Sequence, residues 1–199
     1  WQMVLNFLAG GAAINALAAH AGAEVRVVDA GVLRDIDHPH LHVAKVRAGT
    51  ANMTLGPAMS RDDAETLVER GIAFARDECE RGADVIALGD MGIGNTTAAA
   101  AITSVLAGAP PRATAGRGTG VDDAAFETKV HGIERAIAIN TPDPLDAIDV
   151  LSKIGGLEIG FLAGVAVGAA ALGRPVVIDG YPTTAAALIA AAMAPPCVD

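Results

Sequence analysis

Residues 83–97 read Ala83-Asp-Val-Ile-Ala-Leu-Gly-Asp-Met-Gly-Ile-Gly-Asn-Thr-Thr97, and they predict a strand that runs directly into a turn and then a helix. The first six residues are mainly apolar, which is typical of a buried strand. Glycines at 89, 92 and 94 end the strand, and a helix is expected to start near Asn95. Because ligands of parallel α/β sheets bind beyond the carboxyl ends of the strands, we expect a site at this turn.

Strand-like and helix-like segments alternate along the rest of the chain. The other expected strands have apolar or alternating patterns: 24–29, a short one around Ala113, and 175–179. Two helices are expected from capping signals: 3–21, which ends before Gly22, and 60–80, which has a Ser60–Asp63 capping box and Gly82 after it. A third is expected from the apolar stripe Phe126, Val130, Ile133 and Ile137. Two more helices follow it, and a last one is opened by Thr183 or Thr184. Residues 34–58 are expected to be irregular.

This alternation predicts the fold class. Strands separated by helices imply parallel βαβ units with right-handed crossovers. We therefore expect an α/β, Rossmann-like parallel sheet with helices on both faces, built as one domain over residues 1–199. Residues 159–173 are expected to form a buried helix in which Gly160, Gly164 and Gly168 let a neighbouring helix approach closely.

Composition narrows the functional classes. The chain has 199 residues and a net charge of −9, which argues against nucleic acid as a partner because no basic stripe is present to release counterions. Cys79 and Cys197 are far apart, so free thiols in a cytoplasmic protein are expected. The run 159–173 is too short to cross a membrane, and no signal peptide is visible. Trp1 and Asp199 look like cut ends rather than natural ones.

Two glycine-rich segments are candidate anion sites. In the first, Met91, Gly92, Gly94, Asn95 and Thr96 precede or open a helix whose free amides and dipole favour a phosphate. This segment has no Walker lysine and lacks the third glycine of a dinucleotide fingerprint, so a tight turn with ordinary capping is the alternative.

The second segment has the same character, and its residues are candidate substrate contacts: Gly116, Arg117, Gly118 and Gly120. A flexible turn capped by Asp122 or Asp123 is the alternative. Lys129 follows one turn into the next helix, where its amine either reaches the same cleft or lies in solvent.

Acids and histidines complete the candidate chemistry. Asp90 ends a strand, so it either polarises a ligand or accepts hydrogen bonds from the loop amides after it. The run from Asp35 to His42 contains three alternate histidines, but Pro39 and the absence of a companion ligand pair favour a solvated loop over a metal site. No cofactor is expected.

Six short blocks occur in one order: Gly10-Gly-Ala-Ala-Ile-Asn15, Gly49-Thr-Ala-Asn52, 89–97, Gly116-Arg-Gly-Thr-Gly-Val-Asp-Asp123, Gly155-Gly-Leu-Glu158 and Asp179-Gly180. In order and spacing they resemble the nicotinate-nucleotide:5,6-dimethylbenzimidazole phosphoribosyltransferase family, over essentially the whole chain. The resemblance implies transfer of phosphoribose from nicotinate mononucleotide to the benzimidazole, with inversion at C1′. It also implies a homodimer and a small helical domain assembled from both termini, which this chain would mostly lack.

The resemblance also assigns residues. It implies that Met91, Gly92, Gly94, Lys129, Gly180 and Thr183 cradle the phosphate and ribose, with Asp179 at the same sheet edge. It implies that Gln2 and Met91 line the benzimidazole pocket. Asp90 stands where many members carry an assisting glutamate. The family's general base is a glutamate in a Ser-Ala-Glu-Pro-Gly-His-like run, which falls beyond residue 199.

The glutamates within the chain have simpler interpretations. Six are expected on exposed helix faces: Glu65, Glu69, Glu78, Glu80, Glu127 and Glu134. Glu158 is expected to complement the dipole of an apolar helix. Two rival functions follow: a nucleotide-binding fragment or pseudoenzyme without turnover, and an unrelated α/β nucleotide enzyme such as a dehydrogenase or kinase. The missing dinucleotide and Walker signatures count against the second rival.

Overall fold

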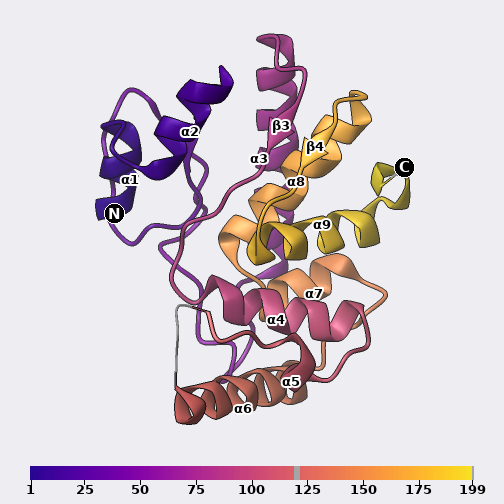
Figure 1. Ribbon diagram of the computed structural model, residues 1–199. Helices are drawn as coiled ribbons and strands as arrows, with labels where there is room; N and C mark the ends of the chain where they lie inside the picture. The colour runs from indigo at the N-terminus through magenta and orange to yellow at the C-terminus, as the bar shows by residue number, and fades with distance from the viewer. Residues whose placement is uncertain (119–121, 199) are drawn as a thin grey trace. The chain divides into compact units, whose positions relative to one another are not determined.

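The computed structural model describes residues 1–118 and 122–198, which form two compact units, Trp1–Gly49 and a second that begins at Thr50 (Figure 1). Gly120, one of the candidate binding residues, lies outside the described residues. Each unit contains a pair of parallel strands as well as helices, so the predicted α/β class is confirmed. The single domain expected over residues 1–199 stays a prediction.

The first unit consists of α1 (Gln2–Leu8), α2 (Ala13–Ala21), β1 (Val27–Asp29) and β2 (Leu41–Val43). The two strands are parallel, with Val27 opposite Leu41. The expectation that residues 34–58 are irregular is wrong at β2. Asp29 stabilises the connection between the two strands. Its Oδ1 accepts hydrogen bonds from the Gly31 and Val32 amides, and its Oδ2 lies 3.1 Å from the Lys45 ammonium.

The helix predicted over residues 3–21 is two helices, so that prediction is wrong in its middle. The chain breaks at Gly10, whose φ of 76° lies in the left-handed region that favours glycine. Asn15 closes the turn, because its side chain accepts from the Ala12 amide at 3.1 Å and donates to the Phe7 carbonyl at 3.1 Å. Gly22, with a φ of 68°, ends α2 as predicted.

The segment Gln2–Ala21 meets a length and composition test for crossing a membrane, with a mean hydropathy of 1.4. Signal sequences and core helices of soluble proteins pass the same test, so one such segment is weak support for membrane insertion.

The second unit is mainly helical. Its elements are α3 (Arg61–Glu80), β3 (Ile86–Ala87), α4 (Asn95–Leu106), α5 (Pro111–Thr114), α6 (Asp123–Asn140), α7 (Ala147–Ile154), α8 (Leu157–Ala171), β4 (Val176–Val177), α9 (Tyr181–Met193) and the 3-10 turn η1 (Pro195–Val198). Two predicted caps are confirmed: Ser60 and Asp63 form a capping box on α3, and Asp122 accepts a hydrogen bond from the Ala125 amide at the start of α6.

Helices α3 and α8 run side by side and form the centre of this unit (Figure 1). Glycines set their separation. A Cβ at Gly164 would lie 2.1 Å from the Val68 carbonyl oxygen, and a Cβ at Gly71 would lie 2.1 Å from the Phe161 carbonyl oxygen. The predicted close approach at the α8 glycines is therefore confirmed.

Strands β3 and β4 are parallel, with Ile86 opposite Val176, and they carry the carboxyl-end loops to one edge. The strand predicted over 83–88 is shorter than expected, and Val85 is exposed rather than buried. The strand expected around Ala113 is wrong: this segment is helix α5, because Pro111 favours the first turn of a helix. Helix α9 begins at Tyr181 rather than at Thr183 or Thr184.

Candidate active site

A cavity of about 390 Å³ lies beside the start of α4 and the first half of α6 in the second unit. Its walls mix backbone, hydroxyl and cationic groups: Met53, Thr54, Thr96, Thr97, Arg117, Gly118, Ala125, Thr128, Lys129 and Gly132. Both predicted glycine-rich segments therefore contribute to one neighbourhood, through Thr96 and through Arg117 with Gly118. A cavity with hydroxyl donors and two cations suits a small anion.

Lys129 joins the two segments. Its ammonium donates to the Thr96 hydroxyl at 2.9 Å and to the Gly116 carbonyl at 2.9 Å. Partial burial lowers the pKa of Lys129, because the charged form loses hydration. A bound anion would restore the stabilisation that the ammonium has lost to burial.

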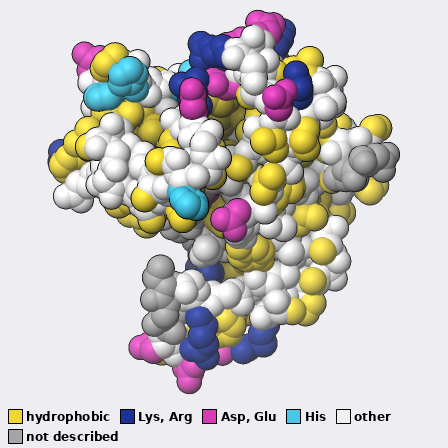
Figure 2. Space-filling model, turned by 45° about the horizontal axis from the view of Figure 1, so that its top comes forward, with side chains coloured by type: hydrophobic (Ala, Val, Ile, Leu, Met, Phe, Trp, Pro, Cys, Tyr) yellow, Lys and Arg dark blue, Asp and Glu magenta, His cyan; other side chains and the backbone are white. Residues whose placement is uncertain are grey.

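Arg117 is held over the start of α6. Its guanidinium lies 2.5 Å from the Asp123 carboxylate and 5.3 Å from the centre of the Phe126 ring. Arg112 on α5 pairs with Glu127 on α6. On the face drawn in Figure 2, Lys and Arg side chains lie beside Asp and Glu side chains.

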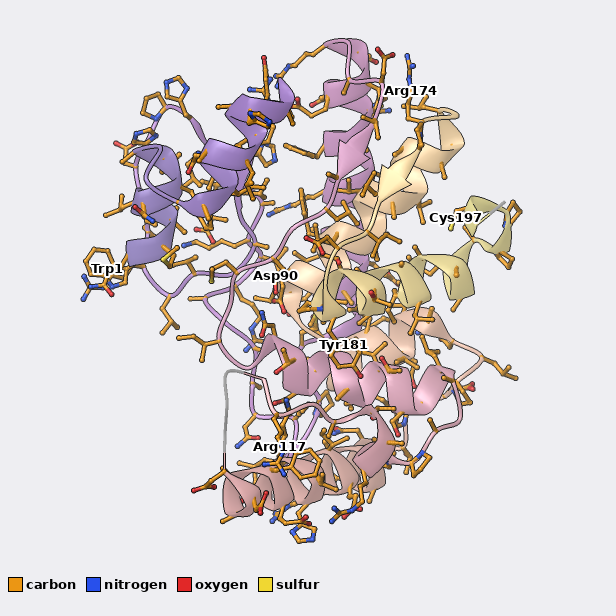
Figure 3. The ribbon with its side chains drawn as sticks, viewed as in Figure 1. Trp1, Asp90, Arg117, Arg174, Tyr181 and Cys197 are labelled. Atoms are coloured by element: carbon orange, nitrogen blue, oxygen red, sulfur yellow. The ribbon has the colours of Figure 1, made fainter. Side chains whose placement is uncertain are left out.

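The loop between β3 and α4 positions Asp90. Its carboxylate accepts a hydrogen bond from the Asn95 side chain at 2.5 Å and a second from the Met91 amide. Burial raises the pKa of Asp90, while these two hydrogen bonds lower it. Gly94 caps α4 with a φ of 79°, and Met91 and Gly92 are exposed. Figure 3 shows Asp90 with Arg117 and Tyr181, which come from three different segments of this unit.

The loop after β4 supplies Asp179 and Gly180, which are exposed, and Thr183, which is fully buried. The Thr183 hydroxyl donates to the carbonyl oxygens of Asp179 at 2.5 Å and Gly180 at 2.9 Å. Tyr181 donates to the Thr114 carbonyl at 2.7 Å and so ties this loop to the end of α5. In this structure the Thr183 hydroxyl therefore stabilises the start of α9.

Two other candidates lie elsewhere. Gln2 is an exposed residue of α1 in the first unit. The rings of His38 and His40 are 5.7 Å apart, and over residues 1–118 and 122–198 no three His, Cys, Asp or Glu side chains gather closely enough to hold a metal ion.

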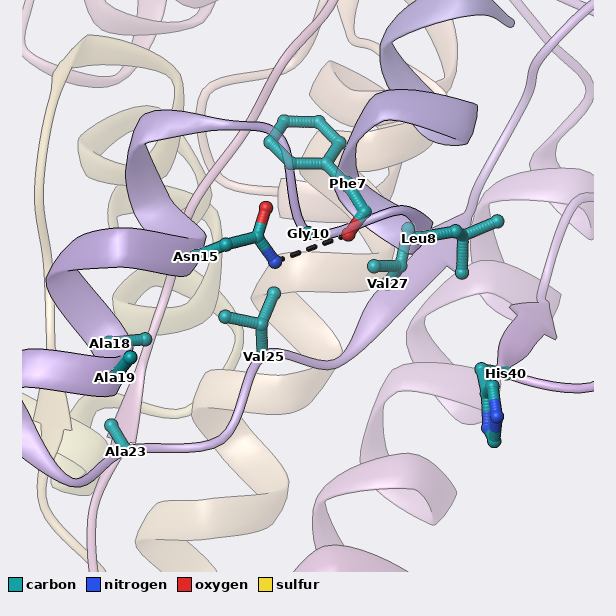
Figure 4. Close-up of a pocket in the computed structure, with 10 residues that line it drawn as sticks. All are labelled: Phe7, Leu8, Gly10, Asn15, Ala18, Ala19, Ala23, Val25, Val27 and His40. Atoms are coloured by element: carbon teal, nitrogen blue, oxygen red, sulfur yellow. Dashed lines mark hydrogen bonds between the residues drawn. The ribbon is translucent and has the colours of Figure 1, made fainter.

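The first unit also contains a cavity of about 340 Å³ (Figure 4). Its lining is mainly apolar: Phe7, Leu8, Gly10, Asn15, Ala18, Ala19, Ala23, Val25, Val27 and His40. The Asn15 amide inside it is already bonded to the Phe7 carbonyl, so the polar group serves the helix turn.

Comparison with known proteins decides the family. A phosphoribosyltransferase family model matches residues 1–199. The chain belongs to this phosphoribosyltransferase family. The nicotinate-nucleotide–dimethylbenzimidazole phosphoribosyltransferase of Chloroflexus aggregans is 54% identical, and the match covers all of this chain and 56% of that protein. The enzyme of the same name from Roseiflexus sp. is 55% identical, and the match covers 98% of this chain and 55% of that protein. A crystal structure of CobT from Thermus thermophilus superposes with a TM-score of 0.94 at 47% identity, covering 98% of this chain and 59% of that one.

These comparisons confirm the resemblance, and they show that the chain spans slightly more than half of the length of these relatives. None of them assigns a role to a single residue.

Sequence reasoning about this phosphoribosyltransferase chain missed three residues. Met53 and Thr54 line the larger cavity, and the Gly49-Thr-Ala-Asn52 block directly before them was the available signal. Glu158 is mostly buried, and burial followed by the negative charge of Asp90 raises its pKa to about 7. The expectation that Glu78 is exposed is wrong. It is buried, and its carboxylate accepts a hydrogen bond from the Arg81 guanidinium at 2.7 Å.

Proposed function

We propose that the protein transfers phosphoribose from nicotinate mononucleotide to 5,6-dimethylbenzimidazole or a similar base, giving α-ribazole 5′-phosphate and nicotinate. Its relatives carry the name of this activity. The observation that carries the proposal for this chain is the cavity in which Lys129, Thr96 and the Gly116–Gly118 segment meet. The cavity offers an ammonium and hydroxyls to a 5′-phosphate.

The proposed reaction is a substitution at C1′ of the ribose. The bond from C1′ to the nicotinate nitrogen breaks and its electron pair leaves with nicotinate, while a benzimidazole nitrogen forms the new bond from the opposite face. The proton on the other benzimidazole nitrogen passes to a base. Positive charge develops on the ribose, so the protein's tasks are alignment of both partners, charge stabilisation and proton removal.

The chain's residues divide these tasks. Lys129, Thr96 and the second glycine-rich segment hold the phosphate, and Met91, Gly92 and Gly94 add the turn before α4. Asp90, fixed by Asn95, provides negative charge for the developing cation. Gln2 belongs to the benzimidazole pocket. The general base is a glutamate outside residues 1–199, as the family resemblance implies.

The protein is proposed to act in the cytoplasm as a homodimer without cofactor or metal. Small molecules are its proposed partners, and neither nucleic acid nor a membrane is among them. The net charge of −9 supports the exclusion of nucleic acid.

A product assay tests the proposed function. The protein at its native full length is incubated with nicotinate mononucleotide and dimethylbenzimidazole, and nicotinate and α-ribazole 5′-phosphate are measured by chromatography with mass detection. We expect the two products in equal amounts, and no product when nicotinate riboside replaces the nucleotide, because the phosphate contacts are lost. Binding of the nucleotide without release of nicotinate would support a nucleotide-binding role and overturn the transferase proposal.

A further inference from the structure

One part of the larger cavity comes from a loop that has no role in the proposed reaction so far. Met53 and Thr54 line the cavity, and both lie in the loop before α3. The loop is closed on itself, because the Ala51 amide donates to the Ala58 carbonyl at 2.8 Å. The place of Met53 and Thr54 in the cavity therefore depends on what holds this loop against the rest of the unit.

Two side chains of α6 hold Met53 and Thr54 by their carbonyl oxygens. Asn140 Nδ2 donates to the Met53 carbonyl at 2.7 Å, and Arg135 Nε donates to the Thr54 carbonyl at 3.0 Å. Asn140 is buried, so its bond is shielded from water, whereas Arg135 is exposed. Because both bonds use backbone oxygens, the side chains of Met53 and Thr54 stay available to the cavity.

The first half of the same helix lines the cavity. Residues three or four apart lie on one face of a helix, and Asn140 continues the spacing of the lining residues. Helix α6 therefore carries both the ammonium proposed to bind the phosphate and the amide that holds the loop. The lining residues of α6 are Ala125, Thr128, Lys129 and Gly132.

The Thr54 hydroxyl has a defined direction. It donates to Asn52 Oδ1 at 2.8 Å, and the same oxygen accepts a hydrogen bond from the Thr54 amide at 3.0 Å. Because its hydrogen is used in this bond, the Thr54 hydroxyl can only accept from a ligand. A sugar hydroxyl can donate to it, whereas an ionised phosphate oxygen has no hydrogen to donate.

We propose that the Met53–Thr54 segment binds the ribose of the nucleotide, with Thr54 accepting a hydrogen bond from a ribose hydroxyl and with Asn140 and Arg135 as positioning residues. This inference rests on the proposed phosphoribosyl transfer, and it assigns the sugar to one part of the cavity and the phosphate to another. Lys129 holds the phosphate, and α6 sets the separation of the two parts because it carries Lys129 and Asn140.

The first experiment tests the ribose contact by calorimetry on the native full-length protein, without the benzimidazole. Thr54→Val keeps the shape of the side chain and removes the acceptor, so nicotinate mononucleotide should bind about three- to tenfold more weakly. The 2′-deoxy and 3′-deoxy analogues of the nucleotide identify the hydroxyl. With one of them, Thr54→Val and the unaltered protein should bind equally well. Equal losses with the nucleotide and with both analogues would overturn the ribose contact.

The second experiment tests Asn140. Asn140→Leu has a similar shape, no charge and no donor, so the nucleotide should again bind about three- to tenfold more weakly. In the unaltered protein, nicotinate mononucleotide should slow amide hydrogen exchange over residues 50–59, and this protection should shrink in the variant because the loop is no longer held. A residue that only ends α6 would not change a protection that depends on the nucleotide.

Ser104→Ala is the matched control. Ser104 is as buried as Asn140, and its hydroxyl donates to the Ala109 carbonyl at 2.6 Å, outside the cavity lining. The melting temperature of this variant should fall, while its affinity for the nucleotide and the protection of residues 50–59 should equal those of the unaltered protein.

Arg135→Lys decides the positioning role if Asn140→Leu does not fold. Arg135 is exposed, and lysine keeps the positive charge while the Nε donor is lost. We expect affinity to fall about two- to threefold, with less protection of residues 50–59. Unchanged affinity and protection in each variant that folds would overturn the positioning role.

These outcomes are separate from the test of the transferase. Nucleotide binding that changes as expected, without release of nicotinate by the unaltered protein, would defeat the proposed transfer and support the ribose contact. Release of nicotinate with equal affinities in all variants would do the reverse. An unaltered protein that does not bind nicotinate mononucleotide would overturn both.

Discussion

Lys129 combines two properties that separately are common and together indicate ligand binding. Its ammonium has lost part of its hydration, and the groups that replace the water are a hydroxyl and a carbonyl rather than a carboxylate. Neutral acceptors leave the positive charge available to an incoming anion. The same two bonds fix the ammonium between the Thr96 and Gly116 segments before any ligand arrives.

Lys129→Ala should weaken nicotinate mononucleotide binding by about 1.5–3 kcal/mol, the range for a hydrogen bond to a charged group. Titration calorimetry on the full-length protein measures this. Lys153→Ala is the control, because Lys153 is a half-buried lysine whose partner is a carboxylate on its own helix. Equal affinities for the Lys129 variant and the unaltered protein would remove Lys129 from the site.

Asp90→Asn separates catalysis from folding. Burial raises the pKa of Asp90, so ionising this carboxyl costs the folded protein free energy, and that cost is complete only above the raised pKa. At neutral pH the Asn variant should therefore melt at the same temperature or slightly higher. Turnover should fall, since the charge that faces the ribose is gone. A large loss of stability with unchanged kcat would show that Asp90 only orders the loop.

At the scale of residues, the sequence predicts which segments contain site residues better than it predicts which side chains contact each other. The segments that contain Thr96, Arg117 and Lys129 were predicted, because glycines and helix starts are visible in one dimension. The burial of Glu158 was not, since it depends on Gly156, whose missing side chain leaves the space that the carboxylate occupies. Glu78 shows the same limit, because its burial depends on packing in three dimensions.

Among the elements, the packing of α3 against α8 depends most on glycines, which have no side chain. Their backbones approach closely where Gly71, Gly164 and Gly168 face the other helix, so dispersion contacts form there between backbone atoms. This dispersion energy is lost if a Cβ is added at one of the positions where the two helices come closest.

Gly164→Ala should destabilise the protein by about 1–3 kcal/mol, because the new Cβ would lie 2.1 Å from the backbone oxygen of Val68 and the helices would have to move apart. Gly132→Ala on α6 is the matched control. No atom lies within 4 Å of its new Cβ, so it should stabilise the helix by about 0.5–1 kcal/mol. Urea unfolding of both variants provides the comparison, and equal effects would contradict the packing argument.

The ends of helices were predictable where a capping side chain or a glycine lies at the end. The Ser60 capping box, the Asp122 cap and Gly22 were predictable for that reason. The break near Gly10 was not, because a single apolar stripe continues across it and the Asn15 bonds that close the turn are visible only in three dimensions.

For the whole molecule, the family and the α/β class follow from blocks of sequence distributed over the entire chain, whereas the complete catalytic apparatus does not. The chain spans 56% of the Chloroflexus aggregans relative. Among the acids that the structure describes, Asp90 is short and tied to Asn95, and burial raises the pKa of Glu158 to about 7. Neither is well placed to accept the benzimidazole proton.

We therefore predict that residues 1–199 alone form product at least about 10²-fold more slowly than a chimera in which they replace the matching part of the Chloroflexus aggregans relative, since a positioned general base contributes about 10²–10⁴-fold. Both proteins are assayed with nicotinate mononucleotide and dimethylbenzimidazole, and circular dichroism confirms that both are folded. Lys129→Ala in the chimera serves as the control for substrate binding. Similar rates for the short chain and the chimera would assign the base to Asp90 or Glu158, and Asp90→Asn and Glu158→Gln in the short chain would then identify which of them accepts the proton.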